Sequence, residues 1–163
     1  MAPAESKGML AEKVGVAARE RAGRGARRRS RELALQALYQ WLVAGHEAGD
    51  LCADAAGREL QRADKPYFET LVRGVVDRAA ALDASLQPFL DRPARALSPV
   101  EHALLLIGAF ELSASPDVPY RVVINEAVEL AKAYGGTDGH KYVNGVLDKL
   151  AAQLRPREAR KDC

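Results

Sequence analysis

Basic side chains are concentrated in one short segment of the chain. The sequence RGARRRSREL at residues 24–33 holds five arginines, and the planar guanidinium of arginine donates two parallel hydrogen bonds to a phosphate. Arg24, Arg28 and Arg31 recur at spacings of four and three residues, so a helix would present them as a continuous positive stripe. Two interpretations remain open at this point: a binding site for a polyanion, or a disordered, solvated leader.

A second segment combines aromatic and polar side chains around a glycine turn. The sequence KAYGGTDGHKYVNG at residues 132–145 places Tyr134 before the turn, and Asp138, Lys141 and Tyr142 after it. Proteins read RNA sequence with aromatic rings that stack on bases and with polar groups that hydrogen-bond to base edges. The alternative is structural: Tyr142 belongs to the core and Asp138 only caps a helix.

Catalytic and cofactor motifs are missing from the sequence. It contains no GxGxxG, GxxxxGK[ST] or GxSxG pattern, and the glycine pair of residues 135–136 fits the end of a helix better than a phosphate loop. His46, His102 and His140 have no cysteine or carboxylate at ligand spacing and are expected at the surface. The two cysteines form no CxxC pair. We therefore expect a non-catalytic protein without cofactor or metal.

Charge is distributed unevenly along the 163 residues. Residues 1–31 hold nine lysines and arginines against three glutamates, whereas residues 32–154 hold eleven against seventeen acids. The acidic central part and the basic ends of the chain indicate two binding partners of different charge, and not a single polyanion. The longest apolar run, residues 103–110, is too short to span a membrane. A cytosolic protein is expected, since glutamates in the first segment disfavour a transit peptide.

Apolar residues recur at helical spacing and never convincingly at strand spacing. The clearest start signal is SPVE at residues 98–101, where Ser98 can cap, Pro99 opens the helix and Glu101 can close a capping box. We predict an all-α fold of about seven helices in two packed helical subdomains, without a sheet. The expected divisions are a flexible basic arm over 1–26, a helical domain over 27–157 and a short basic tail over 158–163. The first expected helix begins at Arg27, and a weaker one covers residues 50–63. The others begin at Asp64, Asp83 and Ser98, after the turn of residues 115–120, and at Thr137 or Asp138.

Three stretches of the sequence together resemble the NusB family of bacterial transcription antitermination factors. They are RRRSRELALQALYQW, VPYRVVINEAVELAK and HKYVNGVLDKLA, and the resemblance extends over residues 27–157. It implies an all-helical, non-enzymatic protein that binds the boxA element of nascent RNA together with NusE, a small-subunit ribosomal protein. It also implies an antitermination complex with NusA, NusG and RNA polymerase, notably in ribosomal RNA operons. Monomer and homodimer both stay open.

The same resemblance implies which residues form the binding surfaces. NusE would contact Tyr39 and Glu101. Two roles therefore stay open for the Glu101 side chain: closing the capping box, or contacting NusE. This chain has His102 and Leu106 where the family often carries a basic residue, and Tyr142 where phenylalanine is common. The implied RNA-binding residues are Arg27, Arg28, Arg29, Arg31, Tyr134, Asp138, Lys141 and Tyr142.

Other classes of protein remain as alternatives. A related helical module precedes the catalytic domain of certain ribosomal RNA cytosine methyltransferases, but this chain has no room for such a domain after Pro156. An enzyme would show activity without a second protein, and a purely structural oligomer would show no affinity for RNA.

Overall fold

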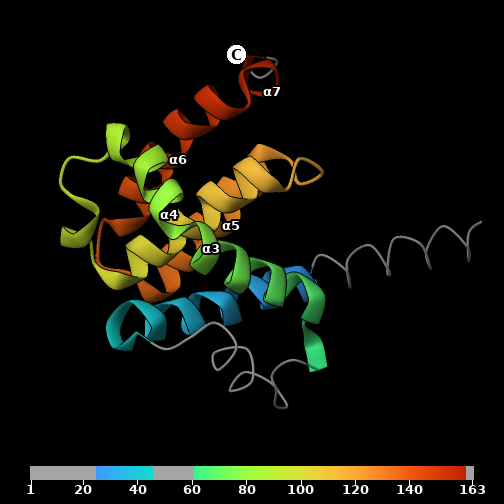
Figure 1. Ribbon diagram of the computed structural model, residues 1–163. Coiled ribbons are helices and arrows are strands. Elements are labelled where there is room, and N and C mark those ends of the chain that lie inside the picture. Colours follow the sequence, from blue (N-terminus) through green and yellow to red (C-terminus); the bar gives the residue numbers. More distant parts are fainter. Residues whose placement is uncertain (1–24, 46–60, 161–163) are drawn as a thin grey trace, which may run out of the picture.

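The computed structural model describes residues 25–45 and 61–160, and helices are the regular secondary structure of both ranges (Figure 1). Residues 25–44 are helical, and we call them the arginine helix. The all-α class predicted from the sequence is confirmed, and none of the described helices is long and apolar enough to cross a membrane. The other described elements are α3 (Lys65–Leu86), η2 (Gln87–Phe89), η3 (Ala94–Ala96), α4 (Pro99–Ala114), α5 (Tyr120–Tyr134), α6 (Gly139–Leu154) and α7 (Pro156–Arg160).

The starts of α3 and α4 follow local signals in the sequence. The Asp64 carboxylate accepts a hydrogen bond from the Tyr67 N–H at 3.1 Å, and the Ser98 hydroxyl accepts one from the Glu101 N–H at 3.3 Å. In both helices a proline lies in the first turn, where its missing N–H has no cost. The predicted N-terminal caps are therefore confirmed at both helices.

One predicted boundary is wrong and another cannot be compared. We expected a new segment to open at Asp83, but α3 continues through it to Leu86, because Val75, Leu82 and Leu86 keep the helical spacing of its buried face. The helix expected over residues 50–63 falls mostly outside the described residues, as do most of the predicted arm and the last three residues of the predicted tail.

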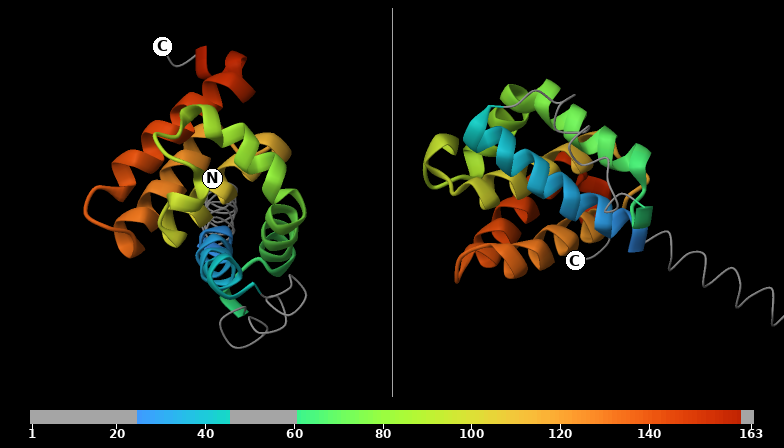
Figure 2. Two further views of the ribbon diagram at one scale, coloured as in Figure 1. Left: turned by 60° about the vertical axis from the view of Figure 1, so that its left-hand side comes forward. Right: turned by 90° about the horizontal axis from the view of Figure 1, so that it is seen from below.

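Helix α4 is the centre of the bundle. Its residues from Ala103 to Leu112 are all buried, and it packs against α3, α5 and α6. The arginine helix lies between α3 and α5 (Figure 2). Its buried residues and those of α3, α4, α5 and α6 form one hydrophobic core. Helix α4 comes very close to α6 at Gly108, where a Cβ atom would lie 2.7 Å from a methyl carbon of Leu147.

The C-terminal residues are tied to the turn between α4 and α5. Helix α6 ends at Leu154, before Pro156, and the next residue, Arg155, turns its guanidinium back into the fold. Glu158 of α7 accepts a hydrogen bond from the backbone N–H of Tyr120 at 2.8 Å. The guanidinium of Arg155 donates to the backbone carbonyls of Glu111, Leu112, Ser115 and Val118.

Candidate nucleic-acid and protein interface

Arg31 is part of a buried network, not of the surface. Its side chain is only 5% exposed, and its guanidinium donates two hydrogen bonds to the Glu111 carboxylate, at 2.8 and 2.9 Å. The Tyr67 hydroxyl donates to the same carboxylate, and the guanidinium carbon of Arg31 lies 5.4 Å from the centre of the Tyr67 ring. Burial lowers the pKa of Arg31, but the hydrogen bonds and charge of Glu111 outweigh that effect, so the pKa is raised.

The continuous positive stripe expected along the arginine helix is therefore wrong at Arg31, because this side chain points into the core. A signal for that orientation was present in the sequence. Arg31 precedes Leu35 and Leu38 by four and seven residues, so it shares the phase of the buried face. Arg24 lies outside the described residues.

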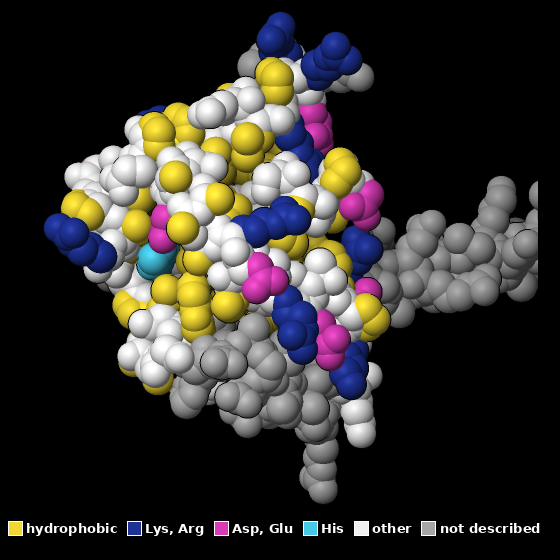
Figure 3. All heavy atoms as spheres, viewed as in Figure 1, with side chains coloured by type: hydrophobic (Ala, Val, Ile, Leu, Met, Phe, Trp, Pro, Cys, Tyr) yellow, Lys and Arg dark blue, Asp and Glu magenta, His cyan; other side chains and the backbone are white. Residues whose placement is uncertain are grey.

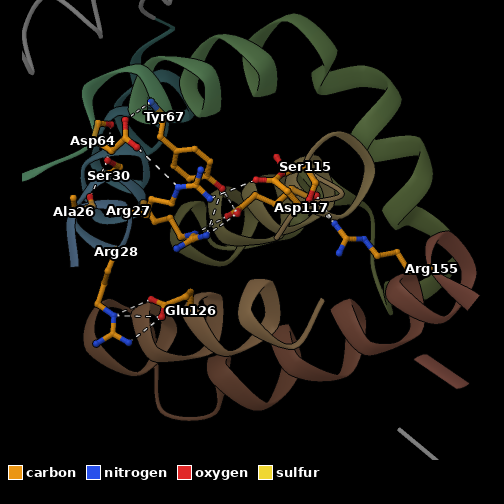
Figure 4. A network of polar contacts seen from close by, with 12 residues as sticks. Ala26, Arg27, Arg28, Ser30, Asp64, Tyr67, Ser115, Asp117, Glu126 and Arg155 are labelled. Carbon is orange, nitrogen blue, oxygen red and sulfur yellow. Dashed lines mark hydrogen bonds and ion pairs between the residues drawn. The ribbon is translucent and has the colours of Figure 1, made fainter. Parts of the chain in front are cut away.

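The other three predicted arginines lie closer to solvent. Arg28 is the most open, with a side chain 67% exposed, and its guanidinium donates to the Glu126 carboxylate at 2.9 and 3.0 Å (Figure 4). Arg27 lies over the Tyr67 ring at 4.6 Å, and Arg29 forms an ion pair with Glu32 at 2.8 Å. Ion pairs at the surface are weak, so phosphate groups can compete for these guanidinium groups.

The turn between α5 and α6 presents Asp138 and Lys141 to solvent. Their side chains are 74% and 73% exposed and form an ion pair at 3.4 Å. Asp138 occupies the capping position of α6, yet among the described residues its carboxylate accepts no capping hydrogen bond. The carboxylate is thus open to another donor, such as a base N–H.

Tyr142 is half-buried and is held by two residues that the sequence reasoning missed. Its hydroxyl donates to the Asp91 carboxylate at 3.0 Å and accepts from the Asp91 backbone N–H at 3.3 Å. The guanidinium of Arg92 lies 5.4 Å from the centre of the Tyr142 ring and donates to Asp91 at 2.7 and 3.0 Å. These hydrogen bonds, first from Arg92 and then from Tyr142, lower the pKa of Asp91 to about 2.

We call Asp91, Arg92, Asp138, Lys141 and Tyr142 the tip. In the sequence, DRP at residues 91–93 indicated only the end of a helix. The contact between this loop and α6 joins residues about fifty positions apart, so no local pattern could have shown it.

Tyr39 and Tyr134 line one groove, which has a volume of about 480 Å³. Their side chains are 43% and 44% exposed, and Val100 forms part of the wall. The Tyr134 hydroxyl donates to Glu32, which raises the pKa of Tyr134. Tyr134, expected among the RNA-binding residues, thus shares a surface with Tyr39, the residue expected to face the protein partner. The remaining residues of the groove are Leu35, Gln36 and Gln40.

Glu101 lies where the groove meets the tip. The Ser98 hydroxyl accepts a hydrogen bond from the backbone N–H of Glu101. The side chain of Glu101 packs against Gly139, the first residue of α6, where a Cβ atom would lie 2.5 Å from a Glu101 carboxylate oxygen. Leu106 is fully buried and so belongs to no binding surface. His102, expected at the surface, is largely buried, with Nε2 2.8 Å from a carboxylate oxygen of Asp83.

Arg27 and Asp138 lie towards opposite ends of α5, whereas Arg29 and Tyr134 both contact Glu32 near the C-terminal end of that helix. Arg27 approaches Asp117, just ahead of α5, while Asp138 follows the end of that helix. The 15 residues of α5 span about 22 Å. Arg28 contacts Glu126 near the middle of α5, and Glu32 contacts Tyr134 at its end, so the arginine helix runs beside α5 along its length.

The face formed by α3 also carries charges of both signs. In Figure 3, lysine and arginine side chains alternate there with acidic ones, so the face carries mixed charge. Within the described ranges, no group of three or more histidine, cysteine, aspartate or glutamate residues could hold a metal ion.

Comparison with known proteins identifies close relatives of the chain. The model of the NusB family matches residues 28–152. A protein of Paraburkholderia phytofirmans named transcription antitermination protein NusB is 57% identical over 136 residues, which cover 83% of this chain and 94% of the relative. The protein of the same name from Nitrosospira multiformis is 60% identical over 129 residues, covering 78% and 82%.

Solved structures show the same fold. The structure of T. maritima NusB is 27% identical, has a TM-score of 0.73, and covers 82% of this chain and 96% of that chain. A structure of the antitermination factors NusB and NusE in complex with dsRNA has a TM-score of 0.66 at 24% identity, with coverage of 77% and 96%.

Proposed function

The chain belongs to the NusB family of transcription antitermination proteins, and from that premise we propose that it binds boxA RNA together with NusE. It acts without catalysis, in the bacterial cytosol, within a complex that includes NusA, NusG and RNA polymerase and resists termination in ribosomal RNA operons. The observation that carries the proposal is the 57% identity to a named antitermination protein over 83% of the chain.

The RNA surface in this proposal has two parts. Arg27, Arg28 and Arg29 contact phosphates at one end, and they give up their surface ion pairs to do so. Lys141 contacts phosphate at the tip, where Tyr142 stacks on a base and Asp138 accepts a hydrogen bond from a base. Arg31 takes no part, because its guanidinium is buried against Glu111.

The protein surface in this proposal is the groove. Tyr39, Tyr134 and Val100 offer apolar and aromatic area, and Glu101 offers a negative charge beside it. Ribosomal proteins are basic, so the charge is complementary. The solved complex of a NusB with NusE and RNA supports NusE as the partner.

The experiment is a fluorescence-anisotropy titration of labelled boxA RNA, with and without NusE. Four cations in contact with phosphate predict that log K falls with log salt at a slope of about −3, using the single-strand coefficient. Scrambled RNA and a duplex of the same sequence serve as controls. A slope near zero would contradict the proposed contacts between the arginines and the RNA phosphates.

The groove is tested in the same titration. Tyr39→Ala should reduce the enhancement of RNA binding by NusE about tenfold. An aromatic side chain that becomes buried when a partner binds is a typical hot spot. Val43→Ala, on the same helix and 60% exposed, is the matched control, since Val43 does not line the groove. Equal behaviour of the two variants would contradict the assignment of the groove to NusE.

A further inference from the structure

Glu101 touches both proposed binding surfaces. The residue before it, Val100, lines the groove with Tyr39 and Tyr134. Its own side chain leans on Gly139, so closely that a Cβ atom there would lie 2.5 Å from a carboxylate oxygen. The carboxylate therefore lies between the place where a protein partner would dock and the first turn of α6, which carries Asp138 and Lys141.

The charge of Glu101 also acts weakly on Arg92 of the tip. The pKa of Arg92 is raised, chiefly by its hydrogen bond with Asp91 and by the charge of that carboxylate, and to a smaller extent by the charge of Glu101. Arg92 in turn lies over the ring of Tyr142. One contact, the approach to Gly139, therefore places Glu101 beside the tip, and the charge of Glu101 acts weakly on Arg92 as well.

A carboxylate in this position opposes the binding of RNA. The tip already carries Asp91 and Asp138 against Arg92 and Lys141, so Glu101 adds negative charge where phosphate groups would approach. Like charges repel through partly aqueous surroundings with an energy large enough to change an affinity severalfold. A basic protein that pairs with Glu101 would cancel this repulsion.

We propose that Glu101 couples the groove to the tip: with the groove empty its carboxylate weakens RNA binding, and a basic partner that neutralises it strengthens RNA binding. This inference rests on the proposed function and adds the route by which one partner favours the other. The coupling is reciprocal, so bound RNA strengthens the binding of the partner by the same factor.

Glu101→Gln tests the proposal because it keeps the shape of the side chain and removes its charge. We expect the full chain with this substitution to bind boxA RNA about threefold to tenfold more tightly than wild type without NusE. The enhancement by NusE should fall by the same factor. If Glu101 is only a partner contact, RNA affinity without NusE stays at the wild-type value, and the proposal is overturned.

Two glycine substitutions test the geometry without changing any charge. Gly139→Ala places a Cβ atom where the Glu101 carboxylate lies and displaces it, whereas Gly145→Ala on the same helix meets no atom within 4 Å. Neither glycine has a positive φ, so alanine fits both backbones. We expect Gly139→Ala to tighten RNA binding without NusE, by less than Glu101→Gln does, and Gly145→Ala to leave it unchanged. Equal affinities for the two variants would overturn the proposed route.

The same titrations separate the coupling from the proposed function. If wild type binds boxA RNA neither alone nor with NusE, the proposed function fails and the coupling fails with it. If wild type binds as proposed but Glu101→Gln matches it in both conditions, only the coupling fails. Thermal melts of all variants show whether a change in affinity comes from a loss of fold.

Discussion

The molecule contains two clusters of an arginine, a tyrosine and a carboxylate, one buried and one at the surface. In the first, Arg31 and Tyr67 both bind the Glu111 carboxylate; in the second, Arg92 and Tyr142 both bind Asp91. In each, the guanidinium carbon lies 5.4 Å from the centre of the tyrosine ring. The main difference between the clusters is in their surroundings.

That difference decides what each cluster can do. Around Glu111 the three side chains are buried, so their hydrogen bonds fix the arginine helix against α3 and α4. Asp91 and Arg92 are exposed, so water and ligands compete for their hydrogen bonds. The cluster around Glu111 therefore stabilises the fold, whereas the cluster around Asp91 is available to bind a ligand.

The largest expected effect comes from removing the carboxylate of the buried cluster. Glu111→Ala leaves the Arg31 charge buried without a counter-ion, which should lower the free energy of unfolding by about 3–5 kcal/mol. Asp91→Ala should leave the melting temperature unchanged. Chemical denaturation of both variants measures the contrast, and equal losses would show that burial does not distinguish the two clusters.

A smaller effect is expected on RNA binding at the surface cluster. Tyr142→Ala should weaken the binding of boxA RNA by about 1–3 kcal/mol, because a base loses its stacking platform. Tyr142→Phe keeps the ring and should bind as wild type does. If Tyr142→Ala melts normally and binds RNA unchanged, the ring is a packing residue and the surface cluster has no part in recognition.

The smallest effect concerns the two hydroxyl groups alone. Tyr67→Phe removes one donor from the buried Glu111 carboxylate and should cost about 1–2 kcal/mol of stability. Tyr142→Phe should stay within about 0.5 kcal/mol, because water replaces the hydroxyl beside Asp91. Unfolding curves that separate the two variants would support the difference between the buried and the exposed cluster. Coincident curves would contradict it.

Sequence reasoning was accurate at three local signals. The caps at Asp64 and Ser98 and the end of α5 before Gly135 depend on neighbouring residues only, and all three are as predicted. Gly135 also meets a local requirement, since a Cβ atom there would lie 2.7 Å from the carbonyl oxygen of Ala131. Such features follow from the geometry of a single turn.

The same reasoning was weakest where a side chain chooses its partner from a distant element. Nothing beside Arg31 in the sequence identifies Glu111, eighty residues away, and Asp91 lies about fifty residues before Tyr142. An arginine run appears uniform until the phase of the neighbouring leucines shows that Arg31 points inward. The assignments of Arg27, Arg28, Arg29, Asp138 and Lys141 to RNA stay predictions.

Arg155 has a consequence for the order in which the protein can be completed during synthesis. The carbonyl groups that its guanidinium binds belong to residues made 37 to 44 positions earlier, around the turn from α4 to α5. While the ribosome is still making α6, this turn has to rely on water for those hydrogen bonds. The native hydrogen bonds of the turn from α4 to α5 therefore form only after Arg155 has been made.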